Sequence, residues 1–310
     1  MPNDIRKQYI YKNNDFHEVV ARDYENDFEV TLTLPGEEAQ TLMFSAFKKH
    51  CEDNDYEEEI GAIVSIPNCI DGKTIRFILI GTNHDILSAD DDNMIEPHGA
   101  FARTTWQFYD IPVVGVTLGL QFDYQDKDQD DGYYYPSNKH GYGTAVTLLQ
   151  TTQDIYNAMP EALQKSMKLV RKDIMIPRIC ITDDYSEIAD HSTITFIENE
   201  GDRYGSRIHC KMFSLSASEV GYTGNDFATT CDYDDNTYEV EGHRYAYFSS
   251  GDTQEARTKR VRYYKSEAYN YWLRSPYLSN SNIWGGVASN GIVGYYSTSD
   301  SNGVAFAFCI

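Results

Sequence analysis

The C-terminal stretch WLRSPYLSNSNIWGGVASNGIVGYYSTSDSNGVAFAFCI, Trp272–Ile310, combines two kinds of sequence. Its middle is rich in Ser, Asn, Gly and Tyr, as in exposed loops and turns, whereas it closes on the apolar GVAFAFCI. Phe306, Phe308 and Ile310 do not suit a disordered tail, because they would leave apolar surface in water. The stretch therefore predicts a rigid apolar frame around exposed, adaptable positions.

The composition of the whole chain is that of a globular protein with an acidic surface. The 310 residues are 41% hydrophobic and 14% aromatic, with 25 Tyr, so they suffice for a sizeable core in one large domain or two small ones. The formal net charge is −22, which repels phosphate backbones and argues against nucleic-acid binding.

The cysteines and the N-terminal residues indicate the cellular compartment in which the protein is made. Six cysteines are scattered without a C-x-x-C pair, so no zinc or redox spacing is present. The N-terminal residues lack the apolar core of a signal peptide, and no run approaches the ~20 apolar residues of a membrane span. We expect free thiols and synthesis in a cytoplasm.

Hydrophobic periodicity predicts helices in the first half and strands in the second. Alternating apolar residues predict a strand over 28–34, and Asp71-Gly72-Lys73 predicts a hairpin turn between two apolar runs. Helical spacing predicts a helix near 37–53 and two further helices over 144–170, separated by a break near Pro160. Short β-type runs follow from about residue 175. We therefore expect an α+β domain.

Several clusters of polar residues are candidate functional sites. Asp126, Asp128 and Asp130 resemble the start of a calcium loop, but Asp131 stands where Gly is required and Ser137 where Glu is required. DYDDN, from Asp232, fails in the same way, with His243 at the twelfth position. Solvated acidic loops are the preferred interpretation, and a loosely built calcium site is the alternative.

His84 and Asp85 follow an apolar strand, which is where an enzyme would place a general base and its orienting carboxylate. No nucleophile motif or metal-binding motif accompanies them, and the same is true of Glu96–His98 and His243. We interpret them as structural and expect no enzyme activity. Arg274 is interpreted first as a clamp that pairs with carboxylates or carbonyls, and second as a cation for a ligand.

The motifs WLRSP, SNGI and GVAFAFCI resemble the C-terminal region of C-type-lectin-fold variable proteins of diversity-generating retroelements, found in phages and gut bacteria. The likeness extends over roughly residues 60–310 and includes KTIRFILIGTNHD and KMFSLSASEVGY. It implies an α+β C-type-lectin-like domain, irregular, with short antiparallel strands, two helices and long loops. Residues 1–55 would be an N-terminal segment, possibly packed on this domain of residues 56–310, whose variable region is 270–310.

The resemblance implies a non-enzymatic binding protein that displays changeable residues on a fixed scaffold. The paired catalytic cysteines of formylglycine-generating enzymes, which share that fold, have no counterpart, because Cys309 stands alone. Adenine-directed mutagenesis of Asn codons cannot create Lys, Glu, Gln, Met or Trp, and residues 273–310 contain none of these except Trp284, which would need a different starting codon or a fixed position. The expected ligand-binding positions are Tyr277, Leu278, Asn280, Asn282, Ile283, Trp284, Ile292, Val293, Tyr295, Tyr296, Thr298 and Asp300.

The expected partner is a protein or glycan on a target surface, and the expected location is a phage virion, with the cytoplasm as the alternative. Assembly into the virion or into a homo-oligomer is compatible with this hypothesis. No cofactor is expected, although Ca²⁺ stays open through the acidic loops. Two other functions remain: a carbohydrate-binding or adhesin module of fixed specificity, assisted by calcium, and an enzyme that uses His84 and Asp85.

Overall fold

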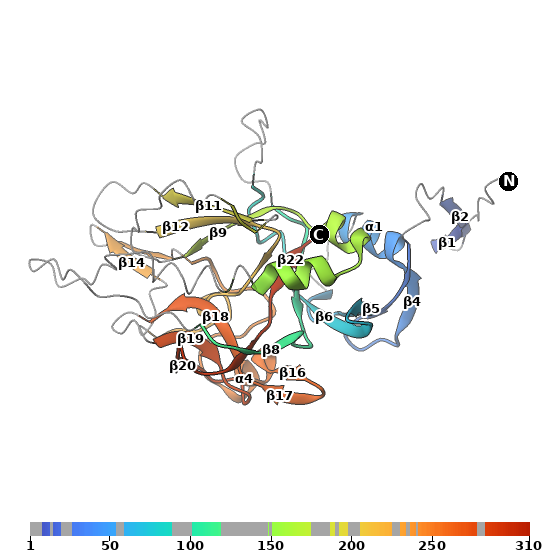
Figure 1. The fold of residues 1–310 in the computed structure, drawn as a ribbon. Coiled ribbons are helices and arrows are strands. Elements are labelled where there is room, and N and C mark those ends of the chain that lie inside the picture. The colour runs from blue at the N-terminus through green and yellow to red at the C-terminus, as the bar shows by residue number, and fades with distance from the viewer. Residues whose placement is uncertain are drawn as a thin grey trace, which may run out of the picture.

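The structure of residues 1–310 is a computed structural model (Figure 1). It describes residues 8–12, 15–19, 27–53, 59–88, 101–118, 148, 151–174, 187–189, 192–197, 205–224, 230–233, 236–239, 241–277 and 283–310.

The largest sheet has seven antiparallel strands and contains the predicted Asp71-Gly72 hairpin. At this turn Asp71 and Gly72 both have positive φ, of 51° and 71°, as a two-residue hairpin turn of this hand requires. The apolar runs on either side of the turn pair with each other, with Ile66 opposite Ile75. In spatial order the strands are β13 (Met212–Phe213), β22 (Ala307–Cys309), β7 (Thr104–Phe108), β6 (Lys73–Thr82), β5 (Ile63–Ile70), β3 (Glu29–Thr33) and β4 (Gln40–Met43).

The C-terminal strand β22 lies inside this sheet, between β13 and β7. Phe308 pairs with Met212 on one side and with Trp106 on the other. Its ring also contacts that of Phe77, with centroids 5.2 Å apart. The apolar ending GVAFAFCI is therefore core, as predicted, and Figure 1 shows the chain rising from the C-terminal strands into the middle of the molecule.

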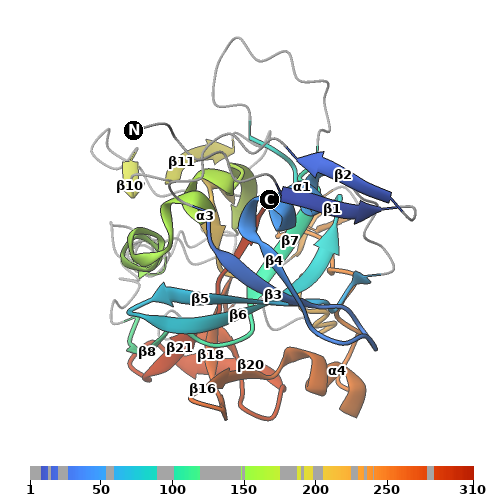
Figure 2. The same ribbon diagram turned by 90° about the vertical axis from the view of Figure 1, so that its right-hand side faces the viewer.

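A five-stranded sheet carries the WLRSP motif and the polar stretch that follows it. Its order is β20 (Val293–Ser297), β19 (Ile283–Val287), β18 (Tyr271–Pro276), β21 (Asn302–Val304) and β8 (Val113–Val116). Neighbouring strands are antiparallel except for the parallel pair β18–β21. Strand β20 is thus an edge strand, and Figure 2 shows β8 beside the red C-terminal strands, below β5 and β6.

The remaining strands form one four-stranded sheet and three hairpins. The four-stranded sheet has the order β10 (Glu187–Ala189), β11 (Ser192–Ile197), β12 (Gly205–Cys210) and β9 (Val170–Ile174). The hairpins are β1 (Gln8–Lys12) with β2 (Asp15–Val19), β14 (Thr230–Tyr233) with β15 (Asn236–Glu239), and β16 (Arg262–Tyr264) with β17 (Glu267–Tyr269).

Helices in the described part of the chain are short. They are α1 (Phe44–Asp53), a helix over 151–158, α3 (Glu161–Ser166) and α4 (Gln254–Arg260). Pro160 occupies the N-cap of α3, which confirms the expected break in the helical region. Thr253 caps α4, because its hydroxyl accepts a hydrogen bond from the backbone N–H of Ala256.

The expected α+β C-type-lectin-like domain with two helices is wrong. The described residues form mainly β-sheet, distributed over several sheets, and the helices are small additions. The expectation failed because it weighted the helical periodicity of 144–170 and treated the runs after residue 175 as irregular short strands. Of those runs, β13 and β22 pair into the seven-stranded sheet with the strands of residues 29–108, and β18–β21 form the five-stranded sheet with β8.

Strands on the two sides of the expected boundary at residue 55 pair with each other. Strand β3 lies on the N-terminal side of that boundary and pairs with β5 on the other side, with Thr31 opposite Ser65. Residues 29–43 thus belong to the same sheet as the C-terminal strand. Among the described residues, no helix has the length and apolar character that crossing a membrane requires.

Candidate functional site

The polar stretch after WLRSP presents an aromatic pair at the surface. Tyr295 on the edge strand β20 is 54% exposed and contacts Tyr277, with ring centroids 4.8 Å apart. Among the described residues, Tyr295 and Phe101 are the two large hydrophobic side chains with this degree of exposure. Tyr277, Ile283 and Ile292 are half-buried, and Asp300 is exposed. These five expected positions are therefore accessible, and we call Tyr277 and Tyr295 the tyrosine pair.

Three expected ligand-binding residues are buried instead. Trp284 has no exposed surface and donates a 2.8 Å hydrogen bond from Nε1 to the carbonyl of Leu273. Val293 and Thr298 are also buried. Burial therefore removes these three side chains from the accessible surface of the hairpin formed by β19 and β20.

Tyr296 has a mainly structural position. Its ring meets Trp272 edge-on, with centroids 6.0 Å apart, and it lies over Gly286, where an added Cβ would come within 2.8 Å of the Tyr296 ring. Gly286 thus leaves the space that this half-buried ring fills. The expected positions Leu278, Asn280 and Asn282 lie outside the described residues.

The predicted frame is confirmed by burial. Trp272, Phe306 and Phe308 are at most 1% exposed, and the Trp272 indole donates a 2.8 Å hydrogen bond to the carbonyl of Val116. Arg274 is the predicted clamp. Its guanidinium donates to the carbonyls of Ser214 and Glu241 and to the Glu219 carboxylate.

A buried network of charges lies behind this frame. Lys172 on β9 donates to Asp85 and, at 2.7 Å, to Oε1 of Glu219, whose Oε2 accepts from Arg274. Tyr245 donates to Asp85 and accepts from Lys172 at 2.7 Å. Each of these five side chains is no more than 5% exposed. We call Asp85, Lys172, Glu219, Tyr245 and Arg274 the charge network.

Opposite charges outweigh burial in setting the pKa values of this network. Burial raises the pKa of Glu219, but Arg274 and Lys172 outweigh it, so the net pKa is below its usual value. Burial likewise raises the pKa of Asp85, and Lys172 reverses the effect. The pKa of Lys172 is lowered by burial and raised more strongly by Asp85 and Glu219. The resting network therefore contains two cations and two anions.

Sequence reasoning identified Asp85 and Arg274 but missed Lys172, Glu219 and Tyr245. A local signal for Glu219 exists in Ser216-Ala217-Ser218-Glu219, an S-x-x-E capping box. The Glu219 carboxylate accepts from the backbone N–H of Ser216 at 3.0 Å, and the Ser216 hydroxyl accepts from the backbone N–H of Glu219 at 3.1 Å. Lys172 carries no such signal, because its partners lie far away in the sequence.

His84 and Asp85 do not form the expected base and orienting carboxylate. The His84 ring stacks on Tyr245, with centroids 3.9 Å apart, and burial lowers its pKa. Atoms of His84, Asp85 and Glu219 lie within 4.8 Å of one another, as metal ligands would. Both carboxylates, however, already face the ammonium of Lys172. A metal ion would have to displace this cation, so the donor set does not fit one.

The other polar candidates lie elsewhere. Asp126–Ser137 and Glu96–His98 are outside the described residues, and Asp232 lies in the hairpin strand β14. His243 is exposed on a loop. The hypothesis of a calcium loop therefore stays a prediction.

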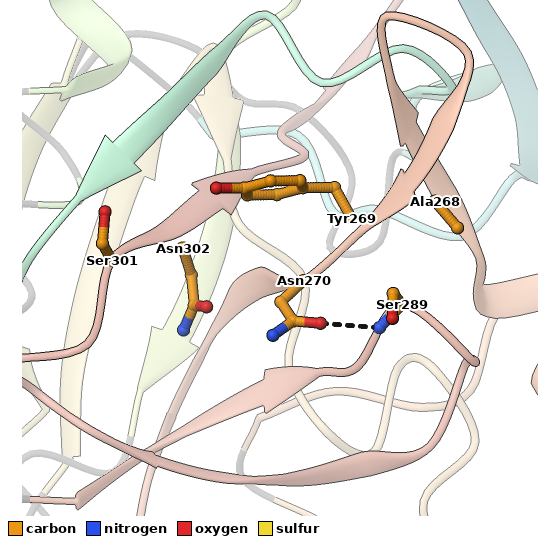
Figure 3. Close-up of a pocket in the computed structure, with 6 residues that line it drawn as sticks. All are labelled: Ala268, Tyr269, Asn270, Ser289, Ser301 and Asn302. Atoms are coloured by element: carbon orange, nitrogen blue, oxygen red, sulfur yellow. Dashed lines mark hydrogen bonds between the residues drawn. The ribbon is translucent and has the colours of Figure 1, made fainter.

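A small polar pocket of about 290 Å³ opens next to the hairpin formed by β19 and β20, which carries Tyr295 (Figure 3). Figure 3 shows the Tyr269 ring across it, with the amides of Asn270 and Asn302 to one side. Asn270 Oδ1 accepts a 2.7 Å hydrogen bond from the backbone N–H of Ser289. Asn302 is only 3% exposed, and its Nδ2 is buried without a hydrogen-bond partner. The lining residues are Ala268, Tyr269, Asn270, Ser289, Ser301 and Asn302.

Comparison with known protein families gives a match for the C-terminal half of the chain. A family model described as "Domain of unknown function (DUF6273)" matches residues 152–310. No curated protein and no solved structure matches the chain. The matched range contains the tyrosine pair, the polar pocket and four members of the charge network, all except Asp85. Because this match covers just over half of the 310 residues, the chain belongs to the DUF6273 family.

Proposed function

We propose that the protein is a non-enzymatic ligand-binding protein that contacts its ligand through the tyrosine pair and the exposed residues beside it. The observation that carries this proposal is the exposure of Tyr295 on an edge strand, in ring contact with Tyr277. Exposed aromatic groups of this kind are a liability on an inert surface, whereas Tyr is enriched where proteins bind partners.

The separation between this surface and the core supports the proposal. The neighbouring side chains Trp272, Trp284 and Arg274 are buried and hydrogen-bonded, so they hold the hairpin independently of the exposed side chains. Exposed positions on such a frame can change without loss of the fold. A catalytic role for Asp85 is less well supported, because buried groups donate hydrogen bonds to both of its carboxylate oxygens.

In this proposal the hairpin of β19 and β20 is the diversified part of the molecule. The ligand is a protein or glycan on a target surface. The absence of Lys, Glu, Gln and Met from residues 273–310 supports diversification, because adenine-directed mutagenesis of Asn codons yields none of them. The protein would then act at the surface of a phage virion, where a changeable contact face is useful.

Binding of the labelled full chain to a panel of bacterial cells and immobilised glycans tests this function. The double variant Tyr277→Ser/Tyr295→Ser should lose most of the binding that the wild type shows. Phe101→Ser is the matched control, because Phe101 is a similarly exposed aromatic residue outside the hairpin. Equal binding by the wild type and the double variant would contradict the proposal.

The polar pocket favours a second function, the recognition of a sugar unit with fixed specificity. Its lining consists of hydroxyl groups, amides and one aromatic face, and it has no charged side chain. The unpaired Nδ2 of Asn302 could donate to a ligand hydroxyl. This interpretation does not require calcium.

Saturation-transfer NMR with a panel of neutral monosaccharides distinguishes the two functions. Asn302→Asp replaces the unpaired donor with an acceptor and should abolish a sugar signal from the pocket. Asn290→Asp is the control, since the Asn290 side chain uses its oxygen to accept from the backbone N–H of Ile292. A sugar signal that survives Asn302→Asp but disappears in the tyrosine double variant supports the first function.

A further inference from the structure

The charge network contains an amine and a carboxyl group on directly opposed backbone positions. Leu87 and Val170 form an antiparallel bridge, flanked by hydrogen bonds from the N–H of Arg171 to the carbonyl of Ile86 and from the N–H of Ser88 to the carbonyl of Leu169. In an antiparallel register, the residue opposite Asp85 is then Lys172. Opposed side chains of this kind lie close together, and the Lys172 ammonium indeed donates to Asp85 Oδ1.

We propose that Lys172 and Asp85 condense to an intramolecular isopeptide bond. The covalent link would join the segment after β6 to β9, and the inference does not rest on the proposed ligand. Three groups are needed for such a step: a nucleophilic amine, donors to the carboxyl oxygens, and a base that accepts the surplus proton.

The donors surround the Asp85 carboxyl group. Tyr245 donates to Oδ1 at 2.8 Å and lies 3.0 Å from Oδ2, while Thr105 and, at 3.2 Å, Cys309 donate to Oδ2. Burial raises the pKa of the Tyr245 hydroxyl and of the Cys309 thiol, so both keep their protons. These groups can stabilise the negative charge that develops on oxygen when an amine adds to Cγ.

Glu219 is placed to receive the surplus proton. Its Oε1 accepts a 2.7 Å hydrogen bond from Lys172 Nζ, and its Oε2 is fixed by Arg274 and by the backbone N–H of Ser216. The Phe213 ring covers the amine, with its centroid 4.1 Å from Nζ. The amine, the carboxyl group and the base are each almost completely buried, so bulk water does not compete with the amine.

The step balances without an outside reagent. Proton transfer from Lys172 to Asp85 gives a neutral amine and a neutral carboxylic acid. Nζ then forms a bond to Cγ and loses a second proton to Glu219. That proton passes to the leaving hydroxyl, the Cγ–O bond breaks, and one water molecule departs. One positive and one negative charge disappear, and the Arg274–Glu219 pair remains.

The product keeps every polar group paired. The new amide N–H faces Glu219 Oε1, and its carbonyl oxygen faces Thr105 and Tyr245. The reaction also removes an ion pair from the interior, where desolvation makes charges costly. Because the ionised pair is the resting state, the reactive neutral pair is a minor species and the condensation should be slow compared with folding.

Intact-mass spectrometry of the denatured full chain tests the bond directly. The wild type, kept folded at neutral pH for a week, should become lighter by the mass of one water molecule. Peptide mapping should then find a branched peptide that joins Asp85 to Lys172. Lys172→Arg keeps a positive charge but should retain the full mass, whereas Lys168→Arg, at a neighbouring exposed lysine, should still lose water.

The variant Asp85→Asn tests the isopeptide bond independently. Its amide can react with the same amine and release ammonia, so its product should have the same mass as the condensed wild type. A wild type that keeps its full mass through the week would overturn the proposal, whether or not the variants fold. So would water loss that persists in Lys172→Arg, or that maps to Asp71-Gly72, where an Asp-Gly sequence can form a cyclic imide.

Discussion

At the scale of single residues, neighbouring tyrosines on β20 have opposite roles. Tyr295 faces solvent, and replacement of an exposed side chain usually changes stability by no more than ~0.5 kcal/mol. Tyr296 packs on Trp272 and fills the space above Gly286. Tyr295→Ser should therefore leave the free energy of unfolding nearly unchanged, whereas Tyr296→Ser should lower it by ~1–3 kcal/mol. Urea denaturation of the two variants checks this, and equal losses would refute the assignment.

The sequence predicted the apolar members of this region better than its exposed ones. Trp272, Phe306 and Phe308 were recognisable as frame because no polar surface suits them, and they are buried. Trp284 was misplaced because its neighbours are Ser, Asn and Gly, which suggested an exposed loop. Its burial depends on the strand pairing of β19 with β18 and β20, a long-range property that local composition does not contain.

At the scale of elements, Arg274 ties β18 to the turn that carries Glu219. Removing one partner of a buried ion pair typically costs ~3–5 kcal/mol, because the other charge stays buried without compensation. Arg274→Met should therefore lower the free energy of unfolding by about this amount. Arg257→Met, which breaks an exposed ion pair with Asp252, is the control and should have little effect. Similar melting temperatures for the two variants would contradict this role of Arg274.

The elements also show where sequence patterns sufficed. The Asp71-Gly72 turn, the strand near residue 30 and the helix break at Pro160 follow from local chemistry, and all three are present. The position of β22 between β13 and β7 could not be predicted, because its partners Met212 and Trp106 are about 100 and 200 residues away. The error in fold class arose partly at this level, from strand order, and partly from too much helix, because β4 (Gln40–Met43) lies where a helix was predicted.

At the scale of the whole molecule, the charge network should shape stability against pH. The pKa of Glu219 is lower in the folded chain than in the unfolded chain, so its contribution is fully present above the unfolded pKa of ~4.3 and is lost as the pH falls further. The free energy of unfolding should thus be steady near neutrality and decrease below about pH 4. Arg274→Met should make this acid slope shallower. A slope unchanged by the substitution would show that Arg274 does not lower the pKa of Glu219.

The gene itself offers the remaining test, because diversification must spare the frame if the molecule is to fold. We expect a near-copy of the DNA that encodes residues 270–310 and a reverse transcriptase gene nearby. Differences between the copies should fall at adenines and change the codons of accessible positions, namely Tyr277, Ile283, Ile292, Tyr295 and Asp300. The codons of Trp272, Trp284, Val293, Gly303 and Phe306 should be unchanged, because substitutions in the core cost several times more than those at the surface. Sequencing the locus decides this. The absence of a second copy would remove active diversification and favour the sugar-binding function of the polar pocket, in which the contact residues are fixed.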